Sequence, residues 1–250
     1  IQQMKVFNYN NKLQQKEYLY EGFSIDINKK NVISFVGAGG KTTLIYNMAE
    51  ELMKLGKNVI ITTTTNMFIS EKYFLYSSDL VEIKKYLNKS KIVVLGTPVG
   101  NNKFTSLTNV SYDELIEICD FLLIESDGSR RLPLKAPHDH EPVIIDKSNI
   151  VIGVAGIDSV GKSIKDICHR KEVVCNILNV DESHIITEED IGVLLSSNKG
   201  QMKYIESFNG SVNYVAAINK CDNKYLIDKG KKISELLNEK NINSVITSFK

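Results

Sequence analysis

The sequence predicts an α/β fold in which a mostly parallel sheet is covered by helices on both faces. Short β-branched runs alternate with stretches of helical periodicity, which is typical of α/β proteins. Most of these runs are continuously apolar, as expected of parallel strands buried on both sides. The chain has 250 residues, of which 42% are hydrophobic and 24% charged, so it can form a sizeable core. We expect one domain over residues 1–250.

The apolar runs define the expected strands, at 32–36, 58–63, 91–95, 121–124, 150–154, 212–218 and 244–246. Helical spacing and capping residues define the expected helices, at 42–55, 112–119, 188–195 and 224–240. Between 162 and 206 the pattern is helical and lacks a strong strand. A small helical insertion is therefore expected at about 162–206 in an otherwise single domain.

The charge balance argues against nucleic acid and anionic membranes as partners. Lys and Arg total 31 against 30 for Asp and Glu, whereas such partners usually require a basic face. No apolar run approaches the roughly 20 residues of a membrane-spanning helix. The four cysteines are scattered without metal-binding spacing, which favours reduced thiols and a cytoplasmic location.

A glycine-rich turn separates the first predicted strand from the first long helix. Residues 32–43 read VISFVGAGGKTT, and this strand–loop–helix context is typical of a phosphate-binding loop. Phe35 stands where the common motif begins with Gly, which leaves a short loop resembling that of Mur-type ligases. We expect Mg²⁺ at Thr42, with Lys41 also a catalytic candidate, and triphosphate binding by Gly37, Ala38, Gly39, Gly40, Lys41, Thr42 and Thr43.

A second segment, residues 156–163, matches the full phosphate-loop spacing as GIDSVGKS. Its context is weaker, because Asp158 would place a carboxylate among phosphates and the residues after Ser163 form a poorer helix. The sequence pattern alone does not exclude residues 156–163 as the phosphate-binding loop.

The predicted strand at 121–124 runs directly into Glu125-Ser126-Asp127. A carboxylate at such a strand end can hold Mg²⁺, and a second can orient water, which is the logic of a Walker B segment. We expect Asp127 to bind Mg²⁺ and Glu125 to position water or substrate, both as catalytic residues. An acidic turn without function is the alternative.

Near the carboxyl end, residues 219–222 read NKCD and resemble the guanine-reading NKxD motif. A carboxylate accepts two hydrogen bonds from guanine but none from adenine at the equivalent position. Thr247-Ser248-Phe249-Lys250 is similar to the loop that closes the guanine pocket. The expected base contacts are Asn219, Lys220, Asp222 and Ser248, so GTP is modestly favoured over ATP; a polar turn is the alternative.

The segment at 127–142, DGSRRLPLKAPHDHEP, is dense in reactive side chains. Arg130, Arg131 and Lys135 are candidates for contacting phosphates or an anionic substrate, and Arg130 is a further catalytic candidate. A metal site at 138–141 is less favoured than a polar substrate loop, because neighbours on an extended chain point in opposite directions.

Taken together, VGAGGKTT, ITTTTNM at 61–67, the 125–142 segment and Cys168-His169-Arg170 closely resemble the YqeC-like selenium-dependent hydroxylase accessory proteins. The likeness covers roughly residues 30–225. It implies a bacterial P-loop protein acting in maturation of selenium-dependent molybdenum hydroxylases, with a hydroxylase or its cofactor as partner. It also attaches phosphate binding to the Lys41 loop and gives no role to 156–163. The threonines at 62–65 are expected to line the cleft.

Three functions are compatible with these motifs. The first is a Mg²⁺-dependent NTPase or NTP-dependent maturation factor using GTP or ATP. The second is an ATP-dependent ligase or transferase in which Arg130 and Lys135 hold an anionic acceptor. The third is a nucleotide-gated scaffold that delivers a cofactor without hydrolysis.

Overall fold

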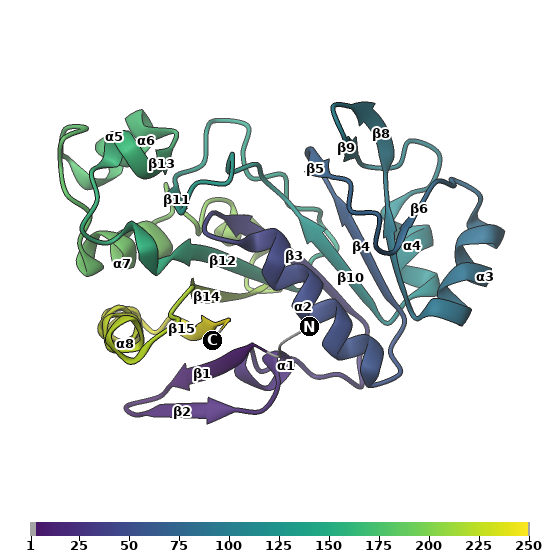
Figure 1. Cartoon of the computed structure of the whole chain (residues 1–250), viewed down its shortest axis with the longest axis horizontal. Coiled ribbons are helices and arrows are strands. Elements are labelled where there is room, and N and C mark those ends of the chain that lie inside the picture. Colours follow the sequence, from purple (N-terminus) through teal and green to yellow (C-terminus); the bar gives the residue numbers. More distant parts are fainter. Residues whose placement is uncertain (1–3, 250) are drawn as a thin grey trace.

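The computed structural model describes residues 4–249 and has a large sheet at its centre (Figure 1). Within these residues the sheet has ten strands in the order β2-β1-β15-β14-β12-β3-β10-β4-β7-β6. The parallel strands are β15 (Asn243–Ser248), β14 (Asn213–Asn219), β12 (Ile150–Gly156), β3 (Asn31–Gly37), β10 (Phe121–Glu125), β4 (Val59–Thr63), β7 (Ile92–Leu95) and β6 (Phe74–Leu75). The predicted α/β fold with a mostly parallel sheet is confirmed.

An antiparallel hairpin extends one edge of the sheet. It is formed by β1 (Lys5–Tyr9) and β2 (Leu13–Lys16), and β1 pairs with β15. The sequence did not predict this hairpin, because β2 reads LQQK and has one hydrophobic residue. The first and last strands of the described chain therefore lie side by side.

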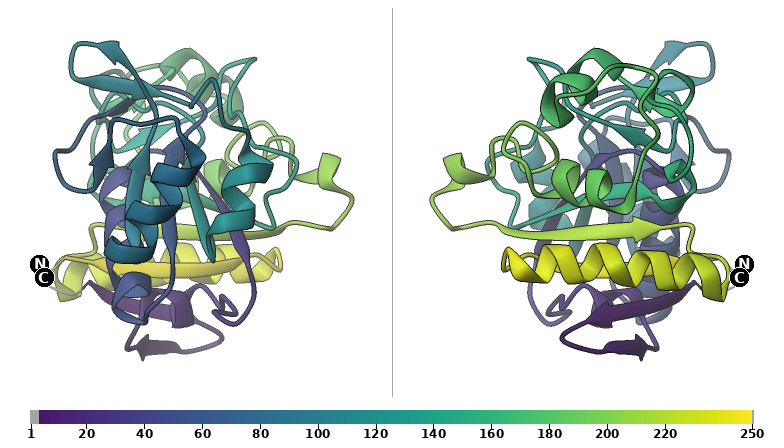
Figure 2. Two further views of the ribbon diagram at one scale, coloured as in Figure 1. Left: turned by 90° about the vertical axis from the view of Figure 1, so that its right-hand side faces the viewer. Right: turned by 90° about the vertical axis from the view of Figure 1, so that its left-hand side faces the viewer.

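Helices cover both faces of the sheet, as predicted. On one face, α2 (Lys41–Lys54) packs Leu44 and Met48 against Ile33 and Phe35 of β3, in a core that also includes α1 (Leu19–Gly22). The other face is covered by α3 (Leu80–Ser90), α4 (Tyr112–Ile118), α7 (Glu188–Ser196) and α8 (Lys224–Glu239). Helix α8 packs against β15, the strand that follows it in the chain (Figure 2). No helix among residues 4–249 is long and apolar enough to cross a membrane.

Capping residues explain where several helices begin. Ser111 and Glu114 form a reciprocal capping box at α4, and Thr187 forms another with Asp190 at α7. Asn223 accepts a hydrogen bond from the N–H of Leu226 at the start of α8. These three starts agree with the sequence prediction.

Residues 162–206, where the sequence predicts mainly helix, contain α5 (Ile164–Ile167), α6 (Lys171–Leu178) and α7, and the 3₁₀ turn Ile205–Phe208 begins at their end. They also contain β13 (Cys168–His169), an unpredicted strand that pairs with β11 (Leu134–Lys135). A separate small sheet is formed by β5 (Met67–Phe68), β9 (Lys103–Thr105) and β8 (Thr97–Gly100). The β11–β13 pair brings the reactive segment after β10 against the helical region.

The parallel strands end at one edge of the sheet. Gly37, Glu125, Gly156, Asn219 and Ser248 are the last residues of five adjacent parallel strands. Ligand sites of open α/β sheets lie at this carboxyl edge. The glycine-rich loop, the acidic segment after β10, the 156–163 segment, NKCD and the 247–249 segment therefore all lie at this edge.

Candidate functional site

The glycine-rich loop joins β3 to α2 with no intervening element. Its backbone is left-handed at Gly39 (φ 89°) and Gly40 (φ 108°), a conformation that favours glycine. A Cβ on Gly39 would lie 2.2 Å from the backbone nitrogen of Gly156. Position 39 therefore requires glycine for two reasons: the left-handed backbone, and the close approach of the loop to Gly156 at the end of β12.

The first N–H groups of the loop are bonded within the protein. Gly37 N–H donates to the Asp127 carboxylate, Ala38 N–H to the Val154 carbonyl at 3.0 Å and Gly39 N–H to the Leu132 carbonyl at 3.1 Å. The start of α2 differs, because no side chain caps it and Thr42 is exposed. Since the first N–H groups of a helix lack intrahelical partners, a bound anion would meet the backbone from Gly40 onward.

Two buried lysines converge on Asp127. Lys41 is 2% exposed, and its Nζ lies 3.0 Å from Asp127 Oδ1 and donates a hydrogen bond to the Gly37 carbonyl. Lys135 is fully buried, and its Nζ lies 3.2 Å from Asp127 Oδ2 and 2.8 Å from Glu141 Oε2. Asp127 therefore fixes the phosphate loop and the segment after β10 to each other.

Glu125, the last residue of β10, reaches the start of α2. The Thr42 hydroxyl donates to Glu125 Oε2 at 2.7 Å. Burial raises the pKa of Glu125, and the positive charge of Lys41 opposes this shift. Hydroxyl and carboxylate oxygens suit Mg²⁺, so this arrangement favours Glu125 over Asp127 as the carboxylate beside Thr42. Residues 4–249 hold no cluster of three or more His, Cys, Asp or Glu that could bind a metal by itself.

The NKCD segment is attached to the phosphate loop. Asn219 is fully buried; its Nδ2 donates to the Gly39 carbonyl at 2.9 Å, and its Oδ1 accepts from the Thr247 hydroxyl at 2.8 Å. Asp222 Oδ1 accepts from the Phe249 N–H at 2.7 Å and from Ser248 Oγ at 3.3 Å. The predicted base-contacting residues Asn219, Asp222 and Ser248 therefore come together. The hydrogen bond from Thr247 to Asn219 was not predicted from the sequence, although the segment containing Thr247 was.

The second phosphate-loop match has different surroundings. After β12 the chain forms a short 3₁₀ turn, Ile157–Ser159, and the following helix α5 has four residues. Asp158 lies in this loop and its carboxylate pairs with Lys220 at 2.9 Å. A carboxylate here and a short helix both disfavour phosphate binding.

The threonines after β4 mainly hold neighbouring segments together. The hydroxyls of Thr62, Thr63 and Thr64 donate to the carbonyls of Leu95, Glu125 and Val143, respectively. These bonds favour a structural role over the expected lining of a cleft.

The arginines and acidic residues of the 127–142 segment have separate environments. The guanidinium of Arg131 stacks over the ring of Phe68 at 4.3 Å, whereas Arg130 borders a cavity near α6.

Glu141 contacts Lys135 and lies 3.7 Å from the Arg170 guanidinium. Burial raises the pKa of Glu141, but hydrogen bonding and charge from Lys135 outweigh it, so this pKa lies below its ordinary value. His169 and Arg170 line the same cavity as Arg130, which the sequence pattern did not predict.

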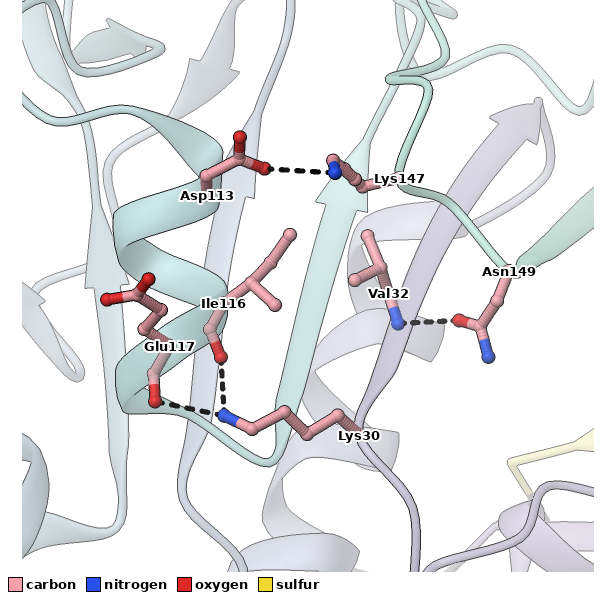
Figure 3. Close-up of a pocket in the computed structure, with 7 residues that line it drawn as sticks. All are labelled: Lys30, Val32, Asp113, Ile116, Glu117, Lys147 and Asn149. Carbon is pink, nitrogen blue, oxygen red and sulfur yellow. Dashed lines mark hydrogen bonds and ion pairs between the residues drawn. The ribbon is translucent and has the colours of Figure 1, made fainter.

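Another cavity, of about 480 Å³, lies beside α4 where β3 begins (Figure 3). Lys30 Nζ donates there to the carbonyls of Ile116 and Glu117, and the Val32 N–H donates to Asn149 Oδ1. These side chains provide hydrogen-bond partners for backbone groups at the end of α4 and the start of β3. The phosphate loop follows the other end of β3. The cavity is therefore not part of the candidate site.

The strand–glycine loop–helix unit, with the acidic strand end beside it, defines the class: an α/β protein with a candidate nucleotide site at the carboxyl edge of its sheet. The chain belongs to the YqeC protein family, whose sequence model matches residues 33–172. It is 31% identical to the "Uncharacterized protein YqeC" of Escherichia coli (strain K12), over 78% of this chain and 79% of the relative. The resemblance inferred from the motifs is thereby confirmed at the level of the family.

Proposed function

We propose that the chain binds a nucleoside triphosphate with Mg²⁺ and acts as an NTP-dependent accessory factor. The observation that carries this proposal is the position of Asn219, which hydrogen-bonds both Gly39 in the phosphate loop and Thr247 beside the base-contacting segment. A single nucleotide can then span from α2 to Asp222. The proposal accounts for the presence of three motifs at one edge of the sheet.

The phosphates lie at the amino end of α2. Backbone N–H groups from Gly40 to Thr43 bind phosphate oxygens, helped by the positive end of the helix dipole. Lys41 exchanges part of its contact with Asp127 for the outer phosphates. Asp127 keeps Lys41 and Lys135 in place, in contrast to the metal-binding role expected from the sequence.

Mg²⁺ is held by the Thr42 hydroxyl and by Glu125. A bound Mg²⁺ supplies positive charge to the phosphates. The Glu125 carboxyl is buried and already accepts a hydrogen bond from the Thr42 hydroxyl. It is therefore the carboxylate best placed to bind this ion. Removal of Mg²⁺ with a chelator should therefore weaken nucleotide binding.

Guanine is favoured over adenine. The backbone N–H of Phe249 and the hydroxyl of Ser248 orient the Asp222 carboxylate at the end of the sheet. An oriented carboxylate accepts from the ring N–H and amino group of guanine, and adenine lacks this donor pair. GTP is therefore the expected ligand, with ATP as the alternative.

Thermal unfolding with GTP, ATP or xanthosine triphosphate, each with Mg²⁺, tests the assignment. Bound ligand stabilises by RT ln(1 + [L]/Kd), or about 2.7 kcal/mol at 100 times Kd. Asp222→Asn should lose the response to GTP and gain one to xanthosine triphosphate, because an amide complements the xanthine N–H and carbonyl. The exposed Asp228→Asn is the matched control. Equal stabilisation by ATP and GTP, with a silent Asp222→Asn, would reject guanine recognition.

The pathway is maturation of selenium-dependent molybdenum hydroxylases. The resemblance of the central motifs supports this part of the proposal. The test is the activity of a selenium-dependent hydroxylase in cells that carry wild-type protein, no protein or the Asp222→Asn variant. Unchanged hydroxylase activity without the protein would contradict it.

A ligase or transferase reaction is the second candidate, and it is favoured by the exposure of Arg130 at a basic cavity. Phosphate release that depends on a second substrate would support it. Tight nucleotide binding without turnover, even with the hydroxylase present, would instead favour a delivery scaffold.

A further inference from the structure

A cavity of about 260 Å³ is lined by the segment after β10 and by the α5–β13–α6 region. The residues that line it are Arg130, Leu132, Lys165, Cys168, His169, Arg170, Lys171 and Glu172. It is separate from the start of α2, where the nucleotide phosphates are proposed to bind.

Positive charge dominates the lining. Four lining residues are Lys or Arg and one is acidic. Lys171 is partly neutralised, because it pairs with Glu182 at 2.8 Å. Arg170 lies 3.7 Å from Glu141, which is outside the lining. The lining itself holds more Lys and Arg than carboxylates, so the cavity favours an anion.

Arg170 has a buried donor without a partner. Its Nε is shielded from solvent and makes no hydrogen bond within residues 4–249. Buried N–H groups are nearly always hydrogen-bonded in proteins. The guanidinium contacts Glu141 only through a long 3.7 Å ion pair, which leaves this arginine able to bind a further acceptor.

His169 forms a buried part of the same wall. It is 7% exposed, and burial, with the charges of Lys135 and Arg170, lowers its pKa to about 4. The ring is therefore neutral near pH 7 and offers one N–H donor.

The backbone at the two arginines is unusual. Arg130 (φ 50°) and Arg170 (φ 59°) both adopt the left-handed conformation, which is uncommon for residues other than glycine. Such conformations cluster at ligand-binding sites. Here they occur at two arginines that line one cavity from different segments.

We propose that this cavity binds a phosphate-type dianion of a second, small-molecule substrate. Arg130 and Arg170 hold the oxyanion as charged donors, His169 adds a neutral N–H, and Lys165 contributes charge at the rim. Binding of the anion stands on these residues alone, whereas its role as second substrate rests on the proposed nucleotide-dependent function.

A chain of ion pairs links the two sites. Lys41 lies 3.0 Å from Asp127, which lies 3.2 Å from Lys135. Lys135 lies 2.8 Å from Glu141, which lies 3.7 Å from Arg170. Occupation of the cavity can therefore influence Lys41 through contiguous contacts.

The test is a titration of the ¹⁵N-labelled full chain with inorganic phosphate at constant ionic strength, with acetate as a monoanionic comparison. Amide shifts of residues 168–172 report the cavity, and those of residues 40–44 report the phosphate loop. We expect saturable shifts at 168–172, with phosphate binding more tightly than acetate.

Substitutions identify the residues responsible. Arg130→Gln and Arg170→Gln should each weaken phosphate binding about tenfold, the usual effect of losing a hydrogen bond to a charged group. Lys165→Gln should weaken it less, and the exposed Lys162→Gln, three positions away but outside the cavity, should leave it unchanged. Arg170→Lys keeps the charge near Glu141 and serves as a second variant if Arg170→Gln does not fold.

Several results would overturn the proposal. These are shifts at 40–44 without shifts at 168–172, equal affinity for acetate and phosphate, or equal weakening by Lys162→Gln and Lys165→Gln. Failure of both GTP and ATP to bind, with the cavity shifts retained, would reject the nucleotide function and leave the anion site standing.

Discussion

The Nζ of Lys41 lies 3.0 Å from Oδ1 of Asp127, and both side chains are buried. The same carboxylate accepts the N–H of Gly37 and pairs with Lys135. A carboxylate at the end of β10 thus fixes the loop that follows the adjacent strand β3. The loop lysine is held in position before any phosphate is bound.

Asp127→Asn should strongly destabilise the protein. The substitution leaves Lys41 and Lys135 buried without their shared negative charge, and breaking a buried pair in this way typically costs about 3–5 kcal/mol. Urea denaturation gives the free energy of unfolding. Glu189→Gln is the control, because the Glu189–Lys232 pair is about half exposed and should contribute less than about 1 kcal/mol. Equal losses in the two variants would contradict the role of Asp127.

Gly39→Ala should destabilise the loop more than Gly128→Ala does. At Gly39, left-handed backbone costs alanine about 1–2 kcal/mol, and the 2.2 Å approach of its Cβ to Gly156 adds an overpacking cost of about 1–3 kcal/mol. At Gly128 an added Cβ meets nothing within 4 Å. Unfolding free energies of the two variants measure the difference, and similar values would show that the loop can relax.

The strand and helix pattern made much of this site predictable. Continuous apolar runs located β3, β10 and β14, and the polar residues that follow each run meet at one sheet edge as expected. Glycine, lysine and threonine at 37–42 also predicted the turn into α2. These features depend on local sequence and on the common direction of parallel strands.

Side-chain partners were less predictable, because they depend on contacts between distant segments. The sequence suggested that Thr42 and Asp127 hold Mg²⁺ together, but it did not indicate that the Thr42 hydroxyl bonds Glu125 or that Asp127 meets two lysines. The short strand β13 gives no periodic signal, yet it places His169 beside Lys135. A two-residue strand can be recognised only once its partner is known.

Thr247→Val should weaken both the fold and nucleotide binding. The substitution removes the donor to Asn219 Oδ1, which is buried, and an unsatisfied buried acceptor costs about 1–3 kcal/mol. Because Asn219 also holds Gly39, the GTP-dependent rise in unfolding temperature should decrease. Thr108→Val, at an exposed loop position, should change neither quantity. A stable Thr247→Val variant with an unchanged GTP response would contradict the proposal that Asn219 connects the phosphate loop to the base-contacting segment.

His169 should make stability depend on pH below neutrality. Burial and the charges of Lys135, Arg170 and Arg130 lower its pKa to about 4, while Glu141 acts in the opposite direction. The unfolded chain, with a histidine pKa of about 6.5, therefore binds more protons between these values. Stability from this residue is complete above pH 6.5, falls with decreasing pH by up to about 1.4 kcal/mol per unit, and is lost below pH 4.

Denaturation of wild type, His169→Gln and the control His138→Gln between pH 7.5 and 4.5 measures this dependence. His138 is exposed, so its removal should leave the wild-type slope, whereas His169→Gln should flatten it. Inorganic phosphate should flatten the wild-type slope as well, because an anion in the adjacent cavity favours protonated His169 and so raises its pKa. Parallel slopes for all three proteins would show that His169 is protonated as readily in the folded chain as in the unfolded one.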